Sequence, residues 1–311
     1  MTSSSQNKWN RDEVELGSLD DLVSLLLARA DRHLIYRGHG RYDWNLVTTL
    51  TRRLRDLART GGMDLDLLES YVVKPELEAT VSEVEELLLR AFMDEADRLA
   101  IPSLPPNDDR LAWWELMQHH GAPTRLLDWT RSPFVALWFA IQDVTTNDRE
   151  DGALWIFDTR DSWINQRDLI LKLRSEEGQD WGRFLDSRAW QNRLAEMFIK
   201  EQNVVAMVIN PRFVVPRSIA QQSVMTLVAN AHDPTGVQHY PLAVLSTKVR
   251  VRAAWRADIL TMCDNLGITR LDLFKDLDSL GSSLASALSS NTVPTAGDVS
   301  ARTWIRNRFG D

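Results

Sequence analysis

The densest group of side chains that could do chemistry lies in "MQHHGAPTRLLDWTRSPFVALWFA", residues 117–140 of this 311-residue chain. Two adjacent histidines, His119 and His120, are followed by an arginine, Asp128 and Thr130, and an apolar segment stands at each end. A helix that stops, a short strand and a new helix would bring these side chains and free backbone N–H groups together. Since helix N-termini attract phosphate, the stretch predicts a site for a phosphorylated ligand.

Two further stretches carry polar groups of complementary chemistry. In "LIYRGHGRYDW", residues 34–44, Arg37 and Arg41 could clamp a phosphate or pyrophosphate, and the glycines beside Arg37 would let a ligand approach the backbone. In "PRSIAQQSVMTL", residues 216–227, two glutamines enter a strand. An amide both donates and accepts, which suits a ribose, and Gln221 is the candidate.

Each feature also has a structural explanation. Arg37 could pair with a buried carboxylate, such as that of Asp43 or Asp128. Asp128 could instead accept backbone N–H groups in a turn, and the two histidines could cap a helix end. The two glutamines could be ordinary strand residues.

Several classes of site are disfavoured by what the sequence lacks. The six histidines show no HxxxH or HxH spacing, so no metal site is expected. Cys263 is the sole cysteine, which excludes an internal disulfide and a cysteine-rich zinc site. The GxSxG, GxxxxGK[ST] and GxGxxG patterns of hydrolases, P-loop proteins and dinucleotide-binding folds are missing.

Composition describes an acidic globular chain. The net charge is -8, which gives no general attraction to nucleic acid or anionic membrane. Apolar runs such as "FVALWFAI" are too short to span a bilayer, and the first residues contain no apolar signal-peptide core. We therefore expect a cytoplasmic protein without membrane contact.

Local signals place the elements that must position these residues. Ser18 and Asp21 resemble a capping box before a first helix, and Ser132 with Pro133 has the N-cap and N1 pattern before a buried helix. Glycines 121 and 267 are expected helix stops. Further helices are expected at 64–100, 110–121, 256–267 and 273–286. Strands are expected at 34–38, 124–130, 152–159, 204–210, 223–230 and 243–251.

This order lacks a repeated strand–helix–strand unit, which favours an α+β fold with a split, mixed or antiparallel sheet and helices. We expect one domain over residues 15–285. Residues 1–14 are expected to be disordered, 161–201 to form a helical insertion offering a partner surface, and 286–311 to be a flexible tail.

Together the three stretches resemble the FRG domain, a bacterial family named for a Phe-Arg-Gly signature. Tyr36, Arg37 and Gly38 stand at that signature. A second signature, "HGxPTRLLDWTxxPxxALxFA", is matched from His120 to Ala140. A third, "RxxxQxGxF", is matched at Arg217 and Gln221, whereas Ser223 and Met225 replace its glycine and phenylalanine.

FRG domains in turn resemble the ADP-ribosyltransferase fold, a split sheet that grips NAD in a cleft. The resemblance implies that Arg37 holds the NAD pyrophosphate or ribose and that Gly38 belongs to the same NAD-binding site. It implies that His120 and Thr130 position the nicotinamide ribose and that Trp129 or Thr130 lies against nicotinamide. Asp128 would be the electrostatic stabiliser or base, and Gln221 would hold a ribose hydroxyl.

The resemblance implies an NAD-dependent ADP-ribosyltransferase that modifies a macromolecule, protein or nucleic acid. The setting would be a bacterial toxin or anti-phage effector, with an antitoxin or regulator as a possible partner. One family feature is missing, because Gln221 or Ser223 stands where such transferases carry a catalytic glutamate. Two alternatives stay open: an NAD glycohydrolase, with water as acceptor, and a non-catalytic nucleotide- or protein-binding module.

Overall fold

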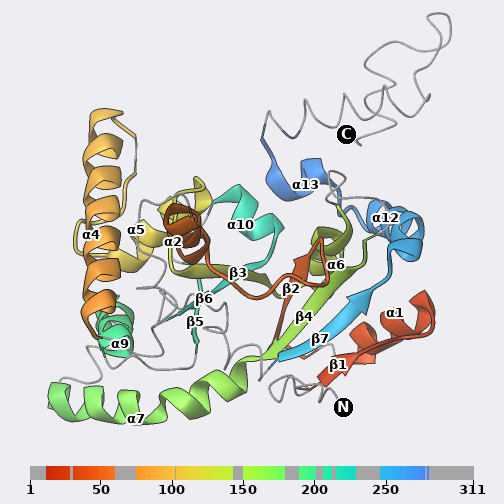
Figure 1. Ribbon diagram of the computed structural model, residues 1–311, viewed down its shortest axis with the longest axis horizontal. Coiled ribbons are helices and arrows are strands. Elements are labelled where there is room, and N and C mark those ends of the chain that lie inside the picture. Colours follow the sequence, from red (N-terminus) through yellow and green to blue (C-terminus); the bar gives the residue numbers. More distant parts are fainter. Residues whose placement is uncertain are drawn as a thin grey trace, which may run out of the picture.

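A mixed sheet flanked by helices forms the centre of the protein (Figure 1). The computed structural model describes residues 12–28, 31–59, 75–101, 103–142, 150–178, 189–200, 206–211, 215–228, 246–276 and 279. Its strands are β1 (Asp12–Val14), β2 (Leu34–His39), β3 (Leu126–Thr130), β4 (Gly152–Asp158), β5 (Met207–Ile209), β6 (Ser223–Leu227) and β7 (Ser246–Val251).

The described part of the chain also contains ten α-helices. They are α1 (Leu19–Ala28), α2 (Thr49–Arg59), α4 (Pro75–Arg98), α5 (Arg110–His119), α6 (Pro133–Ile141), α7 (Thr159–Glu177), α9 (Ala189–Lys200), α10 (Pro216–Ala220), α12 (Arg256–Asn265) and α13 (Arg270–Phe274). Ala253–Trp255 adds a short 3-10 helix. None of the described helices is long and apolar enough to cross a membrane.

The strand order is β1-β7-β4-β2-β3-β6-β5, and every pair is antiparallel except β1 with β7. Both the predicted α+β class and the mixed sheet are thus confirmed. Strand β2 is the central strand of this order. Strand β4 pairs with it along its whole length, from Leu34 opposite Asp158 to His39 opposite Ala153.

One strand was not predicted. Asp12–Val14 pairs in parallel with Thr247–Val249 of β7, so the expectation of disorder up to residue 14 is wrong for these three residues. Residues 1–11 lie outside the described part of the chain, as does the expected tail at 286–311.

The local capping signals act as predicted. Ser18 and Asp21 bond reciprocally, with each backbone N–H 3.1 Å from the other's side-chain oxygen, and α1 begins at the next residue. Ser132 accepts the backbone N–H of Val135 at 3.3 Å, which starts α6. Gly121 and Gly267 have positive φ values of 78° and 68° just beyond α5 and α12.

The start predicted for the last helix, expected at 273–286, is wrong. Helix α13 begins at Arg270, capped by Thr269, and ends at Phe274, where Lys275 takes a left-handed conformation with φ of 54°. Of the residues beyond 276, the structure describes only Ser279.

Helix α6 lies directly on β2, and two glycines make this possible. A Cβ on Gly38 would stand 1.9 Å from the carbonyl oxygen of Ala136, and one on Gly152 would stand 2.3 Å from that of Ala140. Gly38 therefore serves the close approach of helix and strand, rather than only the approach of a ligand as the sequence suggested. Around this contact, α1, α6 and α12 form a buried cluster with the facing side chains of β2, β4 and β7.

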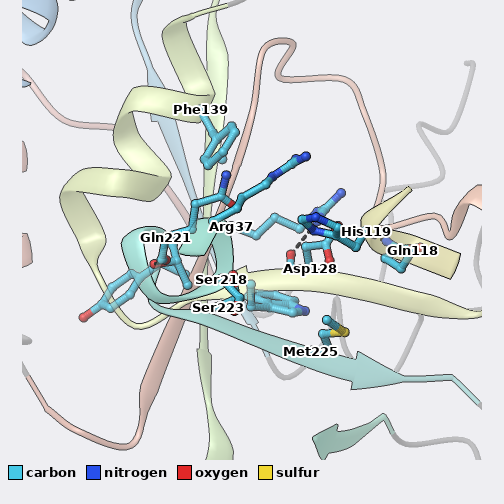
Figure 2. Close-up of a pocket in the computed structure, with 14 residues that line it drawn as sticks. Arg37, Gln118, His119, Asp128, Phe139, Ser218, Gln221, Ser223 and Met225 are labelled. Atoms are coloured by element: carbon cyan, nitrogen blue, oxygen red, sulfur yellow. Dashed lines mark hydrogen bonds between the residues drawn. The ribbon is translucent and has the colours of Figure 1, made fainter. Parts of the chain in front are cut away.

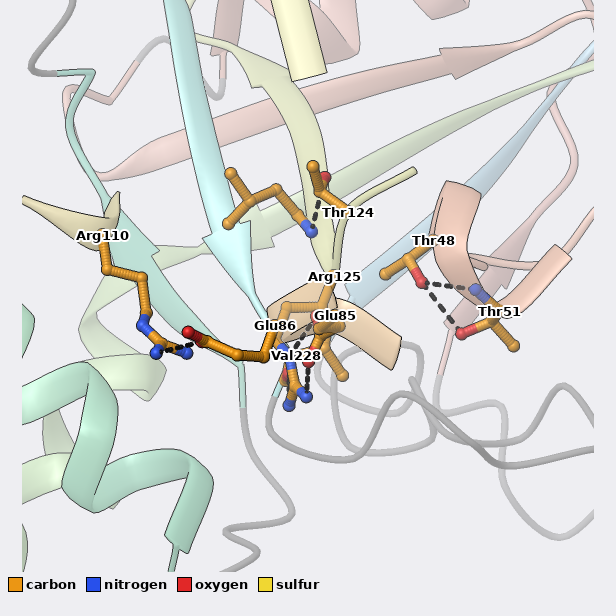
Figure 3. Close-up of polar contacts among 9 residues, drawn as sticks. Thr48, Thr51, Glu85, Glu86, Arg110, Thr124, Arg125 and Val228 are labelled. Carbon is orange, nitrogen blue, oxygen red and sulfur yellow. Dashed lines mark hydrogen bonds and ion pairs between the residues drawn. The ribbon is translucent and has the colours of Figure 1, made fainter. Parts of the chain in front are cut away.

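On the other half of the sheet, α4, α5, α7 and α9 pack with β3, β5 and β6 (Figure 1). Leu173 of α7 and Leu194 of α9 are buried here, so the predicted helical insertion at 161–201 contributes to the core. A buried ion pair joins Arg125, just before β3, to Glu85 of α4; the two side chains are 1% and 5% exposed (Figure 3).

Candidate functional site

The two halves of the sheet meet at one residue pair. Strands β2 and β3 are in register only at Tyr36 and Thr130, whereas every other antiparallel pair of the sheet joins three or more residues. Next to this point, Nη1 of Arg37 donates to the backbone carbonyl of Asp128. The arginine side chain thus closes the edge where backbone pairing stops.

A cavity of about 220 Å³, called here the Asp128 cavity, opens beside this junction (Figure 2). Asp128 and Thr130 of β3 line it, and the residues opposite them on β6, Met225 and Ser223, line it too. Alternate residues of a strand point to one face, so these four share a face of the sheet.

Helices provide the remaining walls of the Asp128 cavity. Gln118 and His119 come from the end of α5, and Phe139 comes from α6. Arg217 and Gln221 come from α10 and the residue after it. Five elements distant in the sequence therefore converge on one cavity with β2.

The carboxylate of Asp128 is held in place by a relay of two side chains. Thr124 Oγ1 donates to Gln118 Oε1 at 2.5 Å, which turns the amide nitrogen of Gln118 toward Asp128. That nitrogen donates to Asp128 Oδ2 at 2.9 Å. One carboxylate oxygen is thereby oriented by the protein, and Asp128 stays exposed to the cavity.

Three arginines surround this carboxylate without forming an ion pair. Within the described residues, Arg37, Arg52 and Arg217 have no carboxylate oxygen within 4.0 Å, whereas Arg41, Arg125 and Arg250 do. Burial lowers the pKa of each of the three, and the charge of Asp128 opposes that shift. Arginine nevertheless stays protonated near neutral pH, so the site concentrates positive charge that its own carboxylate does not balance.

His39 holds Arg37 in this position. Nε of Arg37 donates to His39 Nε2 at 2.9 Å. Burial, and then the charge of Arg37, lower the pKa of His39 well below its ordinary value. The imidazole is therefore neutral near pH 7 and can accept the guanidinium hydrogen bond.

A second cavity, of about 540 Å³, lies on the other side of Arg37. Trp44, Asn45, Arg52 and Gln142 line it, so we call it the Trp44 cavity. The two cavities share three lining residues, Arg37, Gly38 and Phe139. They are thus neighbouring compartments with a cationic residue between them.

Most of the site residues proposed from the sequence meet in the Asp128 cavity. Arg37, Gly38, Asp128, Thr130 and Gln221 all line it. The hydroxyl of Thr130 donates to the backbone carbonyl of Gln221 at 2.7 Å, which ties the second and third sequence stretches together.

Trp129 also lines the cavity, although its ring is almost wholly buried, whereas His120 does not line it. The indole of Trp129 is 3% exposed in a core cluster with Leu127 and Phe157, and its N–H donates to Thr226. His120 is exposed at the C-cap of α5 and does not line the cavity; His119 does.

Arg37 forms an ion pair with neither of the two carboxylates considered as its structural partners, Asp43 and Asp128. Asp43 accepts from Arg41 at 3.0 Å, and Glu150 lies 3.2 Å from the same arginine. Arg41 is thus engaged by two carboxylates, and it lines neither cavity. Arg37 contacts the backbone rather than the carboxylate of Asp128.

Sequence reasoning missed several residues at the site. His39 lies two positions after Arg37 on β2 and therefore shares its face, which strand alternation could have revealed. Arg217 was noted only as part of a signature. Gln118 had no signal, because every residue of α5 from Leu111 to Met117 is buried and no polar stripe marks one face. Of the two adjacent histidines noted in the sequence, the resemblance favoured His120, whereas His119 lines the cavity.

Comparison with known protein families supports the resemblance to the FRG domain over part of the chain. The family model described as the FRG domain matches residues 32–149. No curated protein matches the chain. No solved structure matches it either.

The matched segment contains β2 and β3, and therefore both Arg37 and Asp128. Helix α10, with Arg217, and Gln221 lie outside it, although the fold brings them to the same cavity. Residues 32–149 of this chain thus match the family model of the FRG domain.

Proposed function

We propose that the protein binds NAD in these two cavities and transfers its ADP-ribose group to a macromolecule. The observation that carries the proposal is the set of three arginines, Arg37, Arg52 and Arg217, that face the cavities without a carboxylate partner in the described part of the chain. Partly buried guanidinium groups left unpaired are suited to a phosphorylated ligand.

Arg37 is the central phosphate contact in this proposal. It borders both cavities, so a pyrophosphate bound there would direct one half of the dinucleotide into each. Its hydrogen bonds to His39 and to the carbonyl of Asp128 fix the guanidinium before ligand arrives. Such preorganisation reduces the entropy lost on binding.

The nicotinamide ribose would occupy the Asp128 cavity. Ser223 offers its hydroxyl and Gln221 its amide oxygen there to the ribose hydroxyls. The Thr130 hydroxyl already donates to the carbonyl of Gln221, and the Gln221 amide nitrogen to that of Leu273. Among the described lining residues Asp128 has the only carboxylate. Its oxygen Oδ2 is already held by Gln118, which leaves the other oxygen for the ligand.

The reaction would break the bond between C1′ of this ribose and the nicotinamide nitrogen. The bonding electron pair leaves with nicotinamide and neutralises its pyridinium charge, while C1′ becomes oxocarbenium-like. The negative charge of Asp128 would stabilise that cation. An acceptor hydroxyl, amine or amide then bonds to C1′ and loses its proton to a base or to water.

A second candidate is nucleotide binding without turnover. It is favoured by the neutral residues at the start of β6, because Gln221 and Ser223 stand where a transferase would carry its glutamate and supply no charge. Hydrolysis of NAD, with water as the acceptor, is the corresponding variant of the enzymatic proposal.

Nicotinamide release from NAD separates these possibilities. The wild type should release nicotinamide, Asp128→Asn should reduce the rate at least about 100-fold, and Arg37→Ala should raise KM strongly. Arg98→Ala is the control, because Arg98 is an exposed arginine of α4 that lines neither cavity. No release from the wild type with cell extract as acceptor source, together with tight NAD binding, would leave the non-catalytic module.

The acceptor and the biological setting are part of the proposal. Labelled NAD incubated with cellular protein and nucleic acid would identify a modified macromolecule by its retained label. Free ADP-ribose as the only labelled product would instead indicate the glycohydrolase. A cytoplasmic toxin or anti-phage role predicts growth arrest on expression in bacteria, and Asp128→Asn should abolish it.

A further inference from the structure

We infer that the Trp44 cavity binds the adenine base of the ligand, so that the nucleotide lies across Arg37 with its adenosine half toward Trp44. This inference rests on the proposed function and names the place of the second half of the dinucleotide. Its evidence is the aromatic and amide groups of the Trp44 cavity and the position of the two arginines beside them.

The first observation is an exposed aromatic ring at a cavity wall. Trp44 is 42% exposed, and it is the only tryptophan among the exposed large hydrophobic residues of the described chain. Its ring packs edge-on against His39, with ring centroids 6.2 Å apart. The residue that positions Arg37 therefore also holds Trp44, and an indole held in this way offers a stacking surface to a base.

The second observation is a pair of amides that line the cavity and have no hydrogen bond to any described residue. Asn45 and Gln142 line the same cavity, and within the described residues neither side chain makes a hydrogen bond. An amide presents a donor and an acceptor together, as does the edge of adenine at its amino group and ring nitrogen. Two such amides beside an aromatic face are suited to a purine.

The third observation is the position of the cations. Arg52 lines the Trp44 cavity and is anchored by its donation to the carbonyl of Val47 at 3.0 Å. Together with Arg37 it places positive charge between the aromatic wall and the Asp128 cavity. Asp43 on the wall of the same cavity is neutralised by Arg41, 3.0 Å away. The adenine base would thus contact the aromatic wall, the phosphates the two arginines, and the second ribose the polar groups of the Asp128 cavity.

The volumes agree with this order. The Trp44 cavity, at about 540 Å³, is within the range of small-molecule sites, roughly 300–1,000 Å³. The Asp128 cavity, at about 220 Å³, is smaller. Of the two bases, the larger bicyclic adenine is therefore assigned to the larger Trp44 cavity and the smaller monocyclic nicotinamide to the Asp128 cavity.

Calorimetric titration of the full chain with AMP and with nicotinamide mononucleotide tests the assignment. Trp44→Ala should weaken AMP about 10- to 100-fold, as loss of base stacking does, and Trp44→Phe should restore most of the affinity. Asn45→Ala should weaken AMP by a smaller factor. Nicotinamide mononucleotide should bind these variants as it binds the wild type.

The reciprocal variant is Ser223→Leu, which fills the Asp128 cavity from β6. It should weaken nicotinamide mononucleotide and leave AMP unchanged. Leu99→Ala, at a residue 71% exposed that lines neither cavity, is the control for handling and folding. Thermal unfolding of each variant shows that a lost affinity is not a lost fold.

Three outcomes would overturn the assignment: no binding of AMP to the wild type, equal AMP affinity in the wild type and Trp44→Ala, or loss of AMP binding in Ser223→Leu alone. Failure of the proposed function has a different signature. In that case AMP binding would still depend on Trp44, but NAD would release no nicotinamide.

Discussion

Arg37 and His39 form a pair across one face of β2, in which the charged guanidinium donates at 2.9 Å to an imidazole that burial keeps neutral. A hydrogen bond from a charged donor contributes about 1.5–3 kcal/mol, so the pair defines where the cation of the site stands. The histidine acts on the ligand through the arginine and is a positioning residue.

Replacing His39 should therefore weaken phosphate ligands. We expect His39→Phe to raise the Kd of ADP-ribose at least about 10-fold, because Arg37 loses its acceptor, and His39→Gln to recover part of the affinity through its amide oxygen. Isothermal titration measures both. His33→Phe, at a histidine before the same strand that lines neither cavity, is the control; equal affinity in all four proteins would contradict the positioning role.

Stability should fall on mild acidification. The pKa of His39 is lowered by burial first, and that of His119 is lowered by burial and then by Arg217. Well above the unfolded-state pKa of about 6.5, these histidines are neutral in both the folded and the unfolded chain. As the pH falls below that value, they become protonated in the unfolded chain but stay neutral in the folded one. Proton uptake therefore favours the unfolded state, and the free energy of unfolding decreases. Urea titrations at pH 7.5 and 5.5 should show a smaller decrease for His39→Gln than for the wild type. An identical decrease would mean that His39 titrates normally in the fold.

The ion pair between Glu85 and Arg125 should be costly to break on one side. Arg125 is 1% exposed, and the pair joins α4 to the start of β3. Removing one partner leaves a buried charge, so Glu85→Gln should lower the free energy of unfolding by about 3–5 kcal/mol, and Glu85→Leu with Arg125→Met should recover much of it. In the exposed pair of Glu95 and Arg98, Glu95→Gln should cost under about 1 kcal/mol. Denaturant unfolding measures each, and a similar loss for both pairs would contradict the prediction.

Gly38→Ala should destabilise the fold, since its Cβ would stand 1.9 Å from the Ala136 carbonyl and 2.5 Å from the Ala140 nitrogen. Helix α6 must then move from β2, and overpacking of this kind costs about 1–3 kcal/mol or more. The Tm of Gly38→Ala should fall by several degrees, while Gly17→Ala, with its nearest contact at 3.4 Å, should change it little. A wild-type Tm for Gly38→Ala would show that the glycine is not required for packing.

Cys263 provides a direct probe of folding. Burial raises the pKa of its thiol to about 11, with a smaller contribution from Asp264, so little thiolate forms at neutral pH. A thiol-specific disulfide reagent at pH 7.5 should react slowly with the native protein and with one equivalent in denaturant, since the chain has one cysteine. Cys263→Ser gives the blank, and rapid reaction of the native protein would place the thiol at the surface.

The sequence predicted most where the signal is local. The capping box at Ser18, the N-cap at Ser132 and the stops at Gly121 and Gly267 depend on neighbours within four residues, and the structure has each of them. Strand β1 escaped prediction because three residues are too short for a hydrophobic period, and its partner β7 lies far along the chain.

The sequence predicted which residues belong to the site better than it predicted how they are arranged. Arg37, Asp128 and Gln221 could be chosen from type and pattern, but their meeting depends on the strand order, which no local signal sets. The distinction between His119 and His120 follows from how α5 is rotated against β3. One residue step turns a helical side chain by about 100°, and the buried packing of Trp113 and Trp114 fixes that rotation.

The single pairing of Tyr36 with Thr130 has a mechanical consequence for the sheet. One backbone register pair links β1, β7, β4 and β2 to β3, β6 and β5, so this junction is the weakest seam of an otherwise continuous ladder. A ligand that contacts Arg37 of β2 and also Asp128 of β3 or Ser223 of β6 would link the two halves of the sheet at this junction. Ligand binding should then slow the amide hydrogen exchange of β3, including at residues that do not contact the ligand.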